Sequence, residues 1–131
     1  MISANAARSI SIREVQRTVA RAFYLTVPQM LSSTRVQPIA SARQIAMYLS
    51  REVAARRSPP VDRDGILEMS APPSFPRIGI AFARDHSSVM HACRKVRRRL
   101  LDDLGYALLI DRLATDVRAH AALSPATQEA A

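Results

Sequence analysis

The sequence predicts an all-α fold in a single domain, and three observations support this prediction. The chain has 131 residues, of which 48% are hydrophobic, and this is enough for one modest core. Apolar residues recur every three or four positions along most of its length, and no segment alternates as a strand would. Helix-start signals precede the apolar stripes. We therefore expect a compact multi-helix domain over residues 10–123, with flexible ends at 1–9 and 124–131.

Capping signals predict the first two helices. Ser11 and Glu14 have the spacing of a capping box, in which each side chain satisfies a free backbone N–H. The apolar stripe behind them consists of Ile12, Val15, Val19 and Phe23. Thr26 and Gln29 repeat the capping pattern, and Pro28 stands early in the short helix that follows, where its missing N–H costs nothing.

A third signal of this kind, Ser41 with Gln44, predicts a helix that runs to about Ala55. Its inward residues would be Ile45, Leu49 and Val53. The polar segment before it, residues 32–41, contains a proline and is predicted to be an extended loop. Residues 56–76 then hold five of the chain's eight prolines, so we interpret them as a long Pro-rich inserted loop.

Residues 77–83 predict a short helix with Ile78 and Phe82 facing inward. A second helix follows after a tight turn, with Asp85 as its N-cap. At 100° per residue, one arc of this second helix faces the core with Val89, Ala92, Cys93, Val96 and Leu100. The opposite side presents Ser87, His91, Arg94 and Arg98, flanked by His86, Met90 and Lys95. A helix whose exposed face is polar first and basic later, after a short helix and a turn, is typical of a helix-turn-helix. Helical spacing continues to residue 123, with Gly105 as an expected kink.

The charge predicts an anionic partner. Nineteen basic residues stand against eleven acidic ones, for a net charge of +8. Residues 84–99 alone hold six basic residues and one acidic residue, a concentration that a general compositional bias does not explain. Nucleic acid or an acidic membrane surface would suit such a chain.

The sequence argues against catalytic, metal and cofactor sites. With only three glycines, it has no phosphate-binding loop, so no ATP binding is expected. His86 and His91 lie about 140° apart around their helix and cannot easily share a metal. Ser87 lies one turn from His91, but no carboxylate orients that histidine as in a hydrolase. Cys93 is the only cysteine, which excludes an internal disulfide and favours a small buried side chain.

The N-terminal sequence lacks the apolar segment of a signal peptide, and no apolar run reaches the ~20 residues of a membrane span. We therefore expect no integral membrane association and a cytoplasmic location, at the nucleoid if the partner is DNA.

One segment carries a specific resemblance. Residues 84–96, RDHSSVMHACRKV, are similar to the start of the recognition helix in the C-terminal DNA-binding domain of the bacterial replication initiator DnaA. The segments IREVQRTVARAFYLTVPQMLSS and ARQIAMYLSREV resemble the opening helices of that domain, and SFPRIGIAF resembles its first helix-turn-helix element. The resemblance covers most of residues 10–100. It implies a Trp-repressor-like all-α fold that binds double-stranded DNA.

The resemblance also implies which residues contact DNA. The major-groove positions are Asp85, His86, Ser87, Ser88 and His91. Lys95 matches a backbone-contacting position, and the exposed Arg94 and Arg98 would neutralise phosphates nearby. Arg43 and Gln44 match a pair that lies near the DNA, although Gln44 has a rival role in the predicted capping box. Arg35 matches an arginine inserted into the adjacent minor groove.

Departures from the family pattern modify these expectations. Ser87 and Ser88 stand where threonines are common, and Gln37 and Ser41 replace positions that are often basic. Ala83 replaces glycines in the helix-turn-helix turn. An alanine in the left-handed backbone conformation costs roughly 1–2 kcal/mol. We therefore expect this turn to differ in shape from the turn of the family.

Family members carry a long ATPase region before this domain, and only a few residues precede Ile10 here. We therefore expect a free-standing, non-enzymatic domain that binds sites like the initiator box TTATCCACA and modulates replication initiation or transcription, with replication proteins as candidate partners. The alternatives are a non-specific nucleoid or RNA-binding protein, and a basic module that docks on an acidic partner or a membrane surface.

Overall fold

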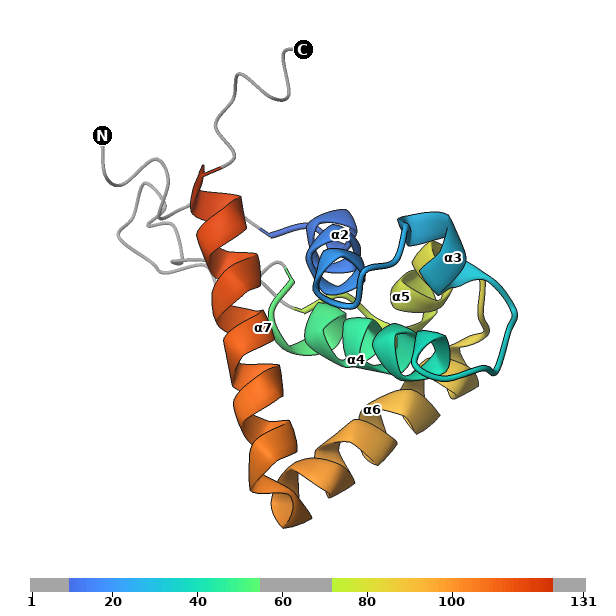
Figure 1. Ribbon diagram of the computed structural model, residues 1–131. Helices are drawn as coiled ribbons and strands as arrows, with labels where there is room; N and C mark the ends of the chain where they lie inside the picture. The colour runs from blue at the N-terminus through green and yellow to red at the C-terminus, as the bar shows by residue number, and fades with distance from the viewer. Residues whose placement is uncertain (1–9, 55–71, 124–131) are drawn as a thin grey trace, which may run out of the picture.

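The computed structural model describes residues 10–54 and 72–123, and within them it contains six helices and no strand (Figure 1). The helices are α2 (Ile12–Ala22), α3 (Val27–Leu31), α4 (Ile39–Glu52), α5 (Phe75–Phe82), α6 (His86–Asp102) and α7 (Leu104–Leu123). This confirms the predicted all-α class. The ends predicted at 1–9 and 124–131 and residues 55–71 lie outside the described part of the chain.

Helix α4 is the centre of the arrangement. It packs against α6 on one side and against α2 on the other, so that α2 and α6 lie on opposite sides of it (Figure 1). Helix α7 runs beside α2 and meets α6 at a sharp corner, and the two form a V that encloses α4. The short helices α3 and α5 close the end of the domain away from α7.

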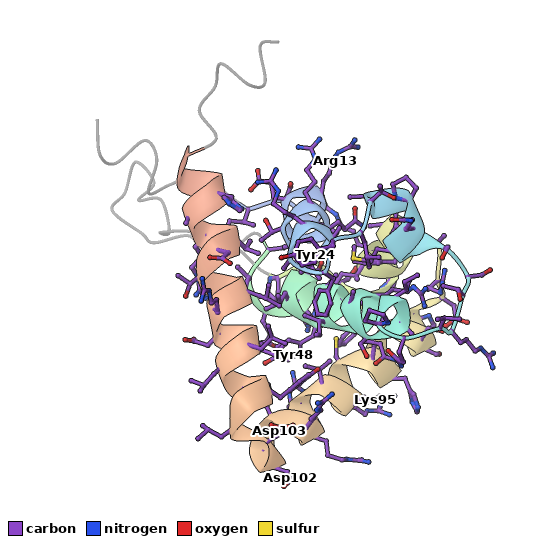
Figure 2. All side chains as sticks on the ribbon, viewed as in Figure 1. Arg13, Tyr24, Tyr48, Lys95, Asp102 and Asp103 are labelled. Carbon is purple, nitrogen blue, oxygen red and sulfur yellow. The ribbon has the colours of Figure 1, made fainter. Side chains whose placement is uncertain are left out.

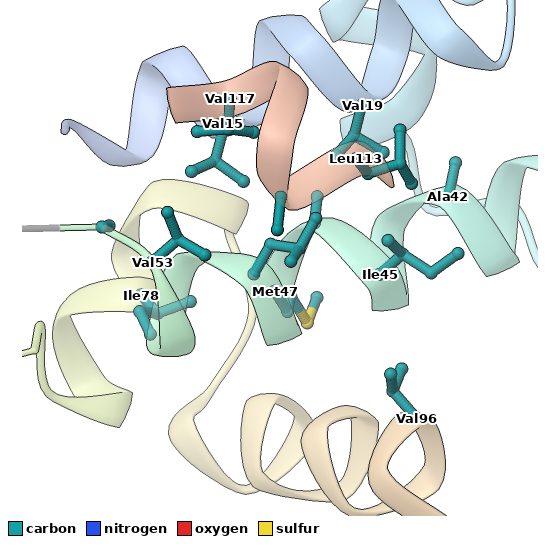
Figure 3. Close-up of a cluster of buried hydrophobic side chains, with 14 of the residues drawn as sticks. Val15, Val19, Ala42, Ile45, Met47, Val53, Ile78, Val96, Leu113 and Val117 are labelled. Atoms are coloured by element: carbon teal, nitrogen blue, oxygen red, sulfur yellow. The ribbon is translucent and has the colours of Figure 1, made fainter. Parts of the chain in front are cut away.

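The hydrophobic core lies where α2, α4, α6 and α7 face one another, and Figure 3 shows part of it. The predicted inward residues of α4, α5 and α6 that are buried include Ile45, Leu49, Val53, Ile78, Phe82, Val89, Cys93 and Val96. In α2, Val15 and Val19 are fully buried, whereas Ile12 and Phe23 are only partly covered. The helical periodicity therefore identified the core side of α2, α4, α5 and α6, whereas Leu104 and Leu108 of α7, which share the helical spacing, are exposed.

Three predicted N-caps are confirmed. The Ser11 hydroxyl accepts a hydrogen bond from the Glu14 N–H at 3.1 Å. Thr26 and Gln29 form both halves of a capping box, at 3.1 Å and 2.8 Å. The Asp85 carboxylate accepts from the Ser88 N–H at 2.9 Å, and this bond is the main reason that the pKa of Asp85 is lowered. Each cap satisfies an N–H that the helix itself leaves free.

The capping box predicted at Ser41 and Gln44 is wrong. Helix α4 begins two residues earlier, at Ile39, and Ser41 lies within its first turn. The Ser41 N–H donates to the side-chain oxygen of Gln37 at 3.0 Å, so a residue before the helix satisfies the N–H groups of its first turn. The helix also ends at Glu52 rather than near Ala55.

Two other predicted boundaries shift. Helix α5 begins at Phe75, with Ser74 as N-cap and Pro76 in its first turn, so the predicted loop 56–76 extends two residues too far. The break before the last helix falls at Asp103 instead of Gly105. The Asp103 N–H closes α6 by donating to Arg99, and its carboxylate accepts from the Tyr106 N–H at 3.0 Å to start α7.

Arg51 fastens α4 to the start of α5. Its guanidinium donates to the Pro73 carbonyl at 2.8 Å and lies 4.4 Å from the centre of the Phe75 ring. This is cation–π geometry. The contact joins the two described parts of the chain and sets the position at which α5 begins.

Cys93 tests the packing of α4 against α6. Its side chain is 2% exposed, with the sulfur 3.9 Å from the Met47 carbonyl, and burial raises its pKa to about 11. At pH 8 about one thiol in a thousand is then ionised, and the buried sulfur is not accessible to an alkylating reagent. We expect iodoacetamide to leave the folded protein unmodified for hours and to modify it fully in denaturant, as measured by intact mass. Rapid modification without denaturant would contradict this packing.

Among the described helices, none combines the length and the apolar character that crossing a membrane requires.

Candidate nucleic-acid interface

Helices α5 and α6 form the predicted helix-turn-helix, joined by a turn at Ala83. This alanine has φ 55° and ψ 43°, which is the left-handed conformation normally occupied by glycine. The Ala83 N–H donates to Ile80 at 3.2 Å and the Arg84 N–H donates to Gly79 at 2.8 Å. The prediction that an alanine requires a differently shaped turn is therefore wrong, because these hydrogen bonds hold Ala83 in the left-handed conformation.

The turn brings the start of α6 onto the backbone of α5. Gly79 is buried, and a Cβ added to it would overlap the Arg84 carbonyl oxygen and lie 3.3 Å from the Asp85 carbonyl carbon. The two helices approach this closely only because position 79 has no side chain.

Helix α6 presents a polar and basic face to solvent. Seven residues of α6 that were predicted to bind DNA are exposed: His86, Ser87, Ser88, His91, Arg94, Lys95 and Arg98. On the other side, Val89, Ala92, Cys93 and Val96 are buried against the core, which confirms the predicted division of the helix.

An open groove of about 1160 Å³ lies between α6, α4 and the loop 32–38. Its lining contains ten of the eleven residues predicted to bind DNA: Arg35, Arg43, Gln44, Asp85, Ser87, Ser88, His91, Arg94, Lys95 and Arg98. His86, at the first position of α6, is exposed but does not line it. The structure thus brings together, from three separate segments, residues that the sequence alone could not place side by side.

Arg43 is built into the wall of this groove. It is only 7% exposed, and its guanidinium donates to the Met30 carbonyl at 2.9 Å and to the Thr34 carbonyl at 2.8 Å. Burial, and then the charge of Arg84, lower its pKa. Arg43 therefore joins α4 to α3 and to the loop 32–38. Whether it also contacts DNA, as the sequence predicts, stays a prediction.

Arg84 holds the same loop from the other side. Its guanidinium donates to the Ser32 carbonyl at 2.7 Å and to the Phe82 and Ala83 carbonyls at 3.2 Å. The loop that carries Arg35 is thus fastened to the helix-turn-helix turn by Arg84 and to α4 by Arg43. Sequence reasoning missed this role, because a bond from a side chain to a distant carbonyl leaves no local pattern.

The remaining groove residues missed from the sequence are Ser33, Gln37, Ala40, Met47 and Ala92. Gln44 lines the groove and, within the described residues, makes no side-chain hydrogen bond. Because its rival capping role is wrong, its amide is left to face the groove.

The basic residues of α6 divide into two sets. Arg97 pairs with Glu52 at 3.2 Å and Arg99 with Asp103 at 3.4 Å, both outside the groove. Arg94, Lys95 and Arg98 line the groove, and no residue of the described chain forms an ion pair with them. Figure 2 shows the acidic Asp102 and Asp103 at the α6–α7 corner, apart from Lys95 in the middle of the helix. The groove therefore keeps a positive charge that an anionic partner can neutralise.

Sequence comparisons relate this chain to bacterial DnaA proteins. Residues 12–61, which include α2, α3 and α4, match the family model described as the bacterial dnaA protein helix-turn-helix. The chain is 37% identical over 97 residues to the chromosomal replication initiator protein DnaA of Lactobacillus delbrueckii subsp. bulgaricus, an alignment that covers 73% of this chain and 18% of the relative. For the same protein of Acinetobacter baylyi, the identity is 37% over 98 residues, covering 74% and 17%. For Acinetobacter baumannii, it is 38% over 91 residues, covering 69% and 16%.

The chain spans less than a fifth of the length of these curated relatives. Its all-helical fold, its helix-turn-helix and these alignments agree with one another. The chain therefore contains a DnaA C-terminal-like helix-turn-helix domain.

Proposed function

We propose that this domain binds double-stranded DNA at DnaA-box-like sequences, with α6 in the major groove and Arg35 in the adjacent minor groove. The observation that carries the proposal is the groove between α6 and the loop 32–38. It gathers hydroxyl, imidazole and basic side chains from α6 and the loop 32–38, and α4 adds Arg43 and Gln44. The groove is open to solvent, as binding to a polymer requires.

The order of residues along α6 suits the two kinds of DNA contact. The major groove of DNA, about 12 Å wide, admits one helix, and the N-terminal residues of that helix approach the base edges. Ser87, Ser88 and His91 lie in this part and can donate or accept hydrogen bonds there. The two serines lack the methyl group with which a threonine touches a thymine, so base preference at those positions is expected to be weaker.

The basic residues further along contact phosphates in this proposal. Arg94, Lys95 and Arg98 lie from the middle of α6 towards its C-terminus. In the proposed complex, this part of the helix rises from the floor of the DNA major groove towards the phosphates. Such contacts supply affinity and orientation without sequence information. The domain would modulate replication initiation or transcription at the nucleoid, by occupying sites that a replication initiator also uses and without catalysis of its own.

Selection of bound sequences from a random duplex pool, at a stated salt concentration, tests this function. We expect enrichment of sequences related to TTATCCACA and a preference of ~10³ or more over random DNA. Binding without any enriched sequence would instead support a non-specific nucleic-acid-binding protein. Equal binding to anionic vesicles in the absence of DNA would support a membrane or acidic-partner module.

Two alanine variants separate base contact from phosphate contact. His91→Ala should weaken binding to the selected site by ~1–3 kcal/mol and leave random-DNA binding almost unchanged, because a base contact matters only on the correct sequence. Arg98→Ala should weaken both alike and lower the slope of log affinity against log salt by roughly one unit. Salt titrations on both duplexes measure this. If His91→Ala weakens both DNAs equally, His91 does not contact bases.

A further inference from the structure

A second basic surface lies on α2, outside the groove. Arg13, Arg17 and Arg21 are all exposed and stand at successive i, i+4 positions. At a rise of 1.5 Å per residue, neighbours in this row are about 6 Å apart, and the row is about 12 Å long. It lies on the side of α2 opposite the buried Val15 and Val19. We call these three residues the α2 arginine row.

The α2 arginine row faces away from the groove. Helix α4 separates α2 from α6, because it packs against both. Figure 2 shows Arg13 projecting from α2 on the side away from α4 and α6, with Lys95 on the opposite side of the domain. A duplex held in the groove would therefore leave the row open to solvent.

The row also has no partner among the residues that the structure describes. Within the described residues, Arg13, Arg17 and Arg21 form no side-chain hydrogen bond or ion pair, unlike Arg97 and Arg99 of α6. The only acidic residue of α2, Glu14, is partly buried. The row is therefore available to an anionic partner.

We propose that the α2 arginine row binds the phosphates of a second DNA duplex, so that one copy of the domain holds two DNA segments. The inference rests on the proposed function for the first segment. Phosphates along one strand of duplex DNA recur every 3.4 Å of axis, so arginines 6 Å apart over 12 Å can neutralise alternate phosphates. Contact through phosphates alone would make this second site independent of sequence.

The apolar side of α2 argues against a membrane as the partner. A helix that lies in a membrane surface inserts its apolar face between the lipids. In α2 that face is occupied, because Val15 and Val19 are fully buried in the core. Because α2 exposes the arginine row but no apolar face, duplex DNA, whose phosphates lie on the outside, suits it better than a membrane.

A bridging assay tests this inference. A duplex with the selected site is immobilised and saturated with protein, and a labelled random duplex is added in about 50 mM salt. We expect the wild type to retain the labelled duplex. Arg13→Ala/Arg17→Ala should bind the immobilised duplex within twofold of wild type but retain at least tenfold less of the labelled one. The salt slope of retention should fall by roughly two units, one for each phosphate contact.

A matched control removes the same charge elsewhere. Arg112 and Arg118 are exposed on α7, so Arg112→Ala/Arg118→Ala lowers the net charge equally and should retain the labelled duplex as the wild type does. Equal loss in both variants would overturn the inference in favour of a general charge effect. Unchanged retention in the Arg13→Ala/Arg17→Ala variant would overturn it as well, and would point to bridging by association of two copies.

Two further outcomes separate this inference from the proposed function. If the wild type binds both duplexes without sequence preference, and the row variant loses only the second, the proposed specificity fails while the second site stands. If the wild type retains no second duplex, but binds phosphatidylglycerol vesicles through Arg13 and Arg17, the row is a membrane contact and the inference is overturned.

Discussion

Gly79→Ala is expected to destabilise the domain by about 2–3 kcal/mol and to lower its melting temperature by roughly 10–20 °C. In the interior of an ordinary helix this substitution stabilises by up to about 1 kcal/mol, because alanine has the higher helix propensity. At position 79 the new methyl group would overlap the backbone carbonyl of Arg84. The Arg84 carbonyl belongs to the backbone and cannot move away by a rotamer change, so α5 and α6 must separate to make room for the methyl group. DNA binding is expected to weaken with stability, since the turn sets the direction of α6.

Gly105→Ala is the matched control. Gly105 also lies within a helix, but an added Cβ there would meet only a side-chain oxygen of Asp103 at 3.5 Å, which is ordinary contact. We expect this variant to be as stable as the wild type or slightly more stable. Thermal and urea unfolding of the three proteins measure the difference. Equal stability of the Gly79→Ala and Gly105→Ala variants would show that the two helices can separate at little cost.

Arg43→Leu is expected to lower the free energy of unfolding by about 2–3 kcal/mol and to abolish the contribution of the loop 32–38 to DNA binding. The substitution leaves the Met30 and Thr34 carbonyls without their donor, and an unsatisfied buried acceptor costs about 1–3 kcal/mol. The loop would then lose its hydrogen bond to the Arg43 side chain, and the backbone that carries Arg35 would be held less firmly. Urea unfolding measures the first effect, and binding to the selected site measures the second.

Arg43→Lys tests whether Arg43 supports DNA binding through its charge or through its hydrogen bonds to the Met30 and Thr34 carbonyls. A lysine keeps the positive charge, but its single nitrogen cannot reach both carbonyls as the guanidinium fork does. If Arg43 positions the loop, Arg43→Lys should bind the selected site almost as weakly as Arg43→Leu. Recovery of wild-type binding by the lysine would mean that Arg43 acts on DNA as a charge, and that bracing by its two hydrogen bonds is unimportant.

The sequence predicted those features that depend on neighbouring residues. The caps at Ser11, Thr26 and Asp85 connect residues three positions apart, and the apolar stripe of α6 follows from helical periodicity alone. Both signals are local, so they survive without knowledge of the fold. The division of α6 into a buried side and a basic side followed from the same periodicity.

The sequence could not predict features that depend on distant partners or on competing local bonds. Arg84 donates to Ser32, fifty-two positions away, and no spacing rule indicates such a pair. Ser41 has the pattern of a cap, but the Gln37 side chain reaches its N–H and α4 begins two residues before it. Ala83 was singled out as the residue in the turn, but it was expected to avoid the left-handed conformation that it adopts. The hydrogen bonds that hold it there were not predicted.

The hydrogen bonds from Arg43 and Arg84 hold the loop 32–38 in place beside α6. Arg84 holds the Ser32 carbonyl and Arg43 holds the Thr34 carbonyl, so the backbone just before Arg35 is tied to the helix-turn-helix turn and to α4. Each base pair advances DNA by about 3.4 Å and turns it by roughly 35°. If the domain binds DNA as proposed, a site with one base pair inserted between its minor-groove and major-groove elements would match either Arg35 or α6, but not both at the same time. The domain would reject it as firmly as a site with the wrong bases.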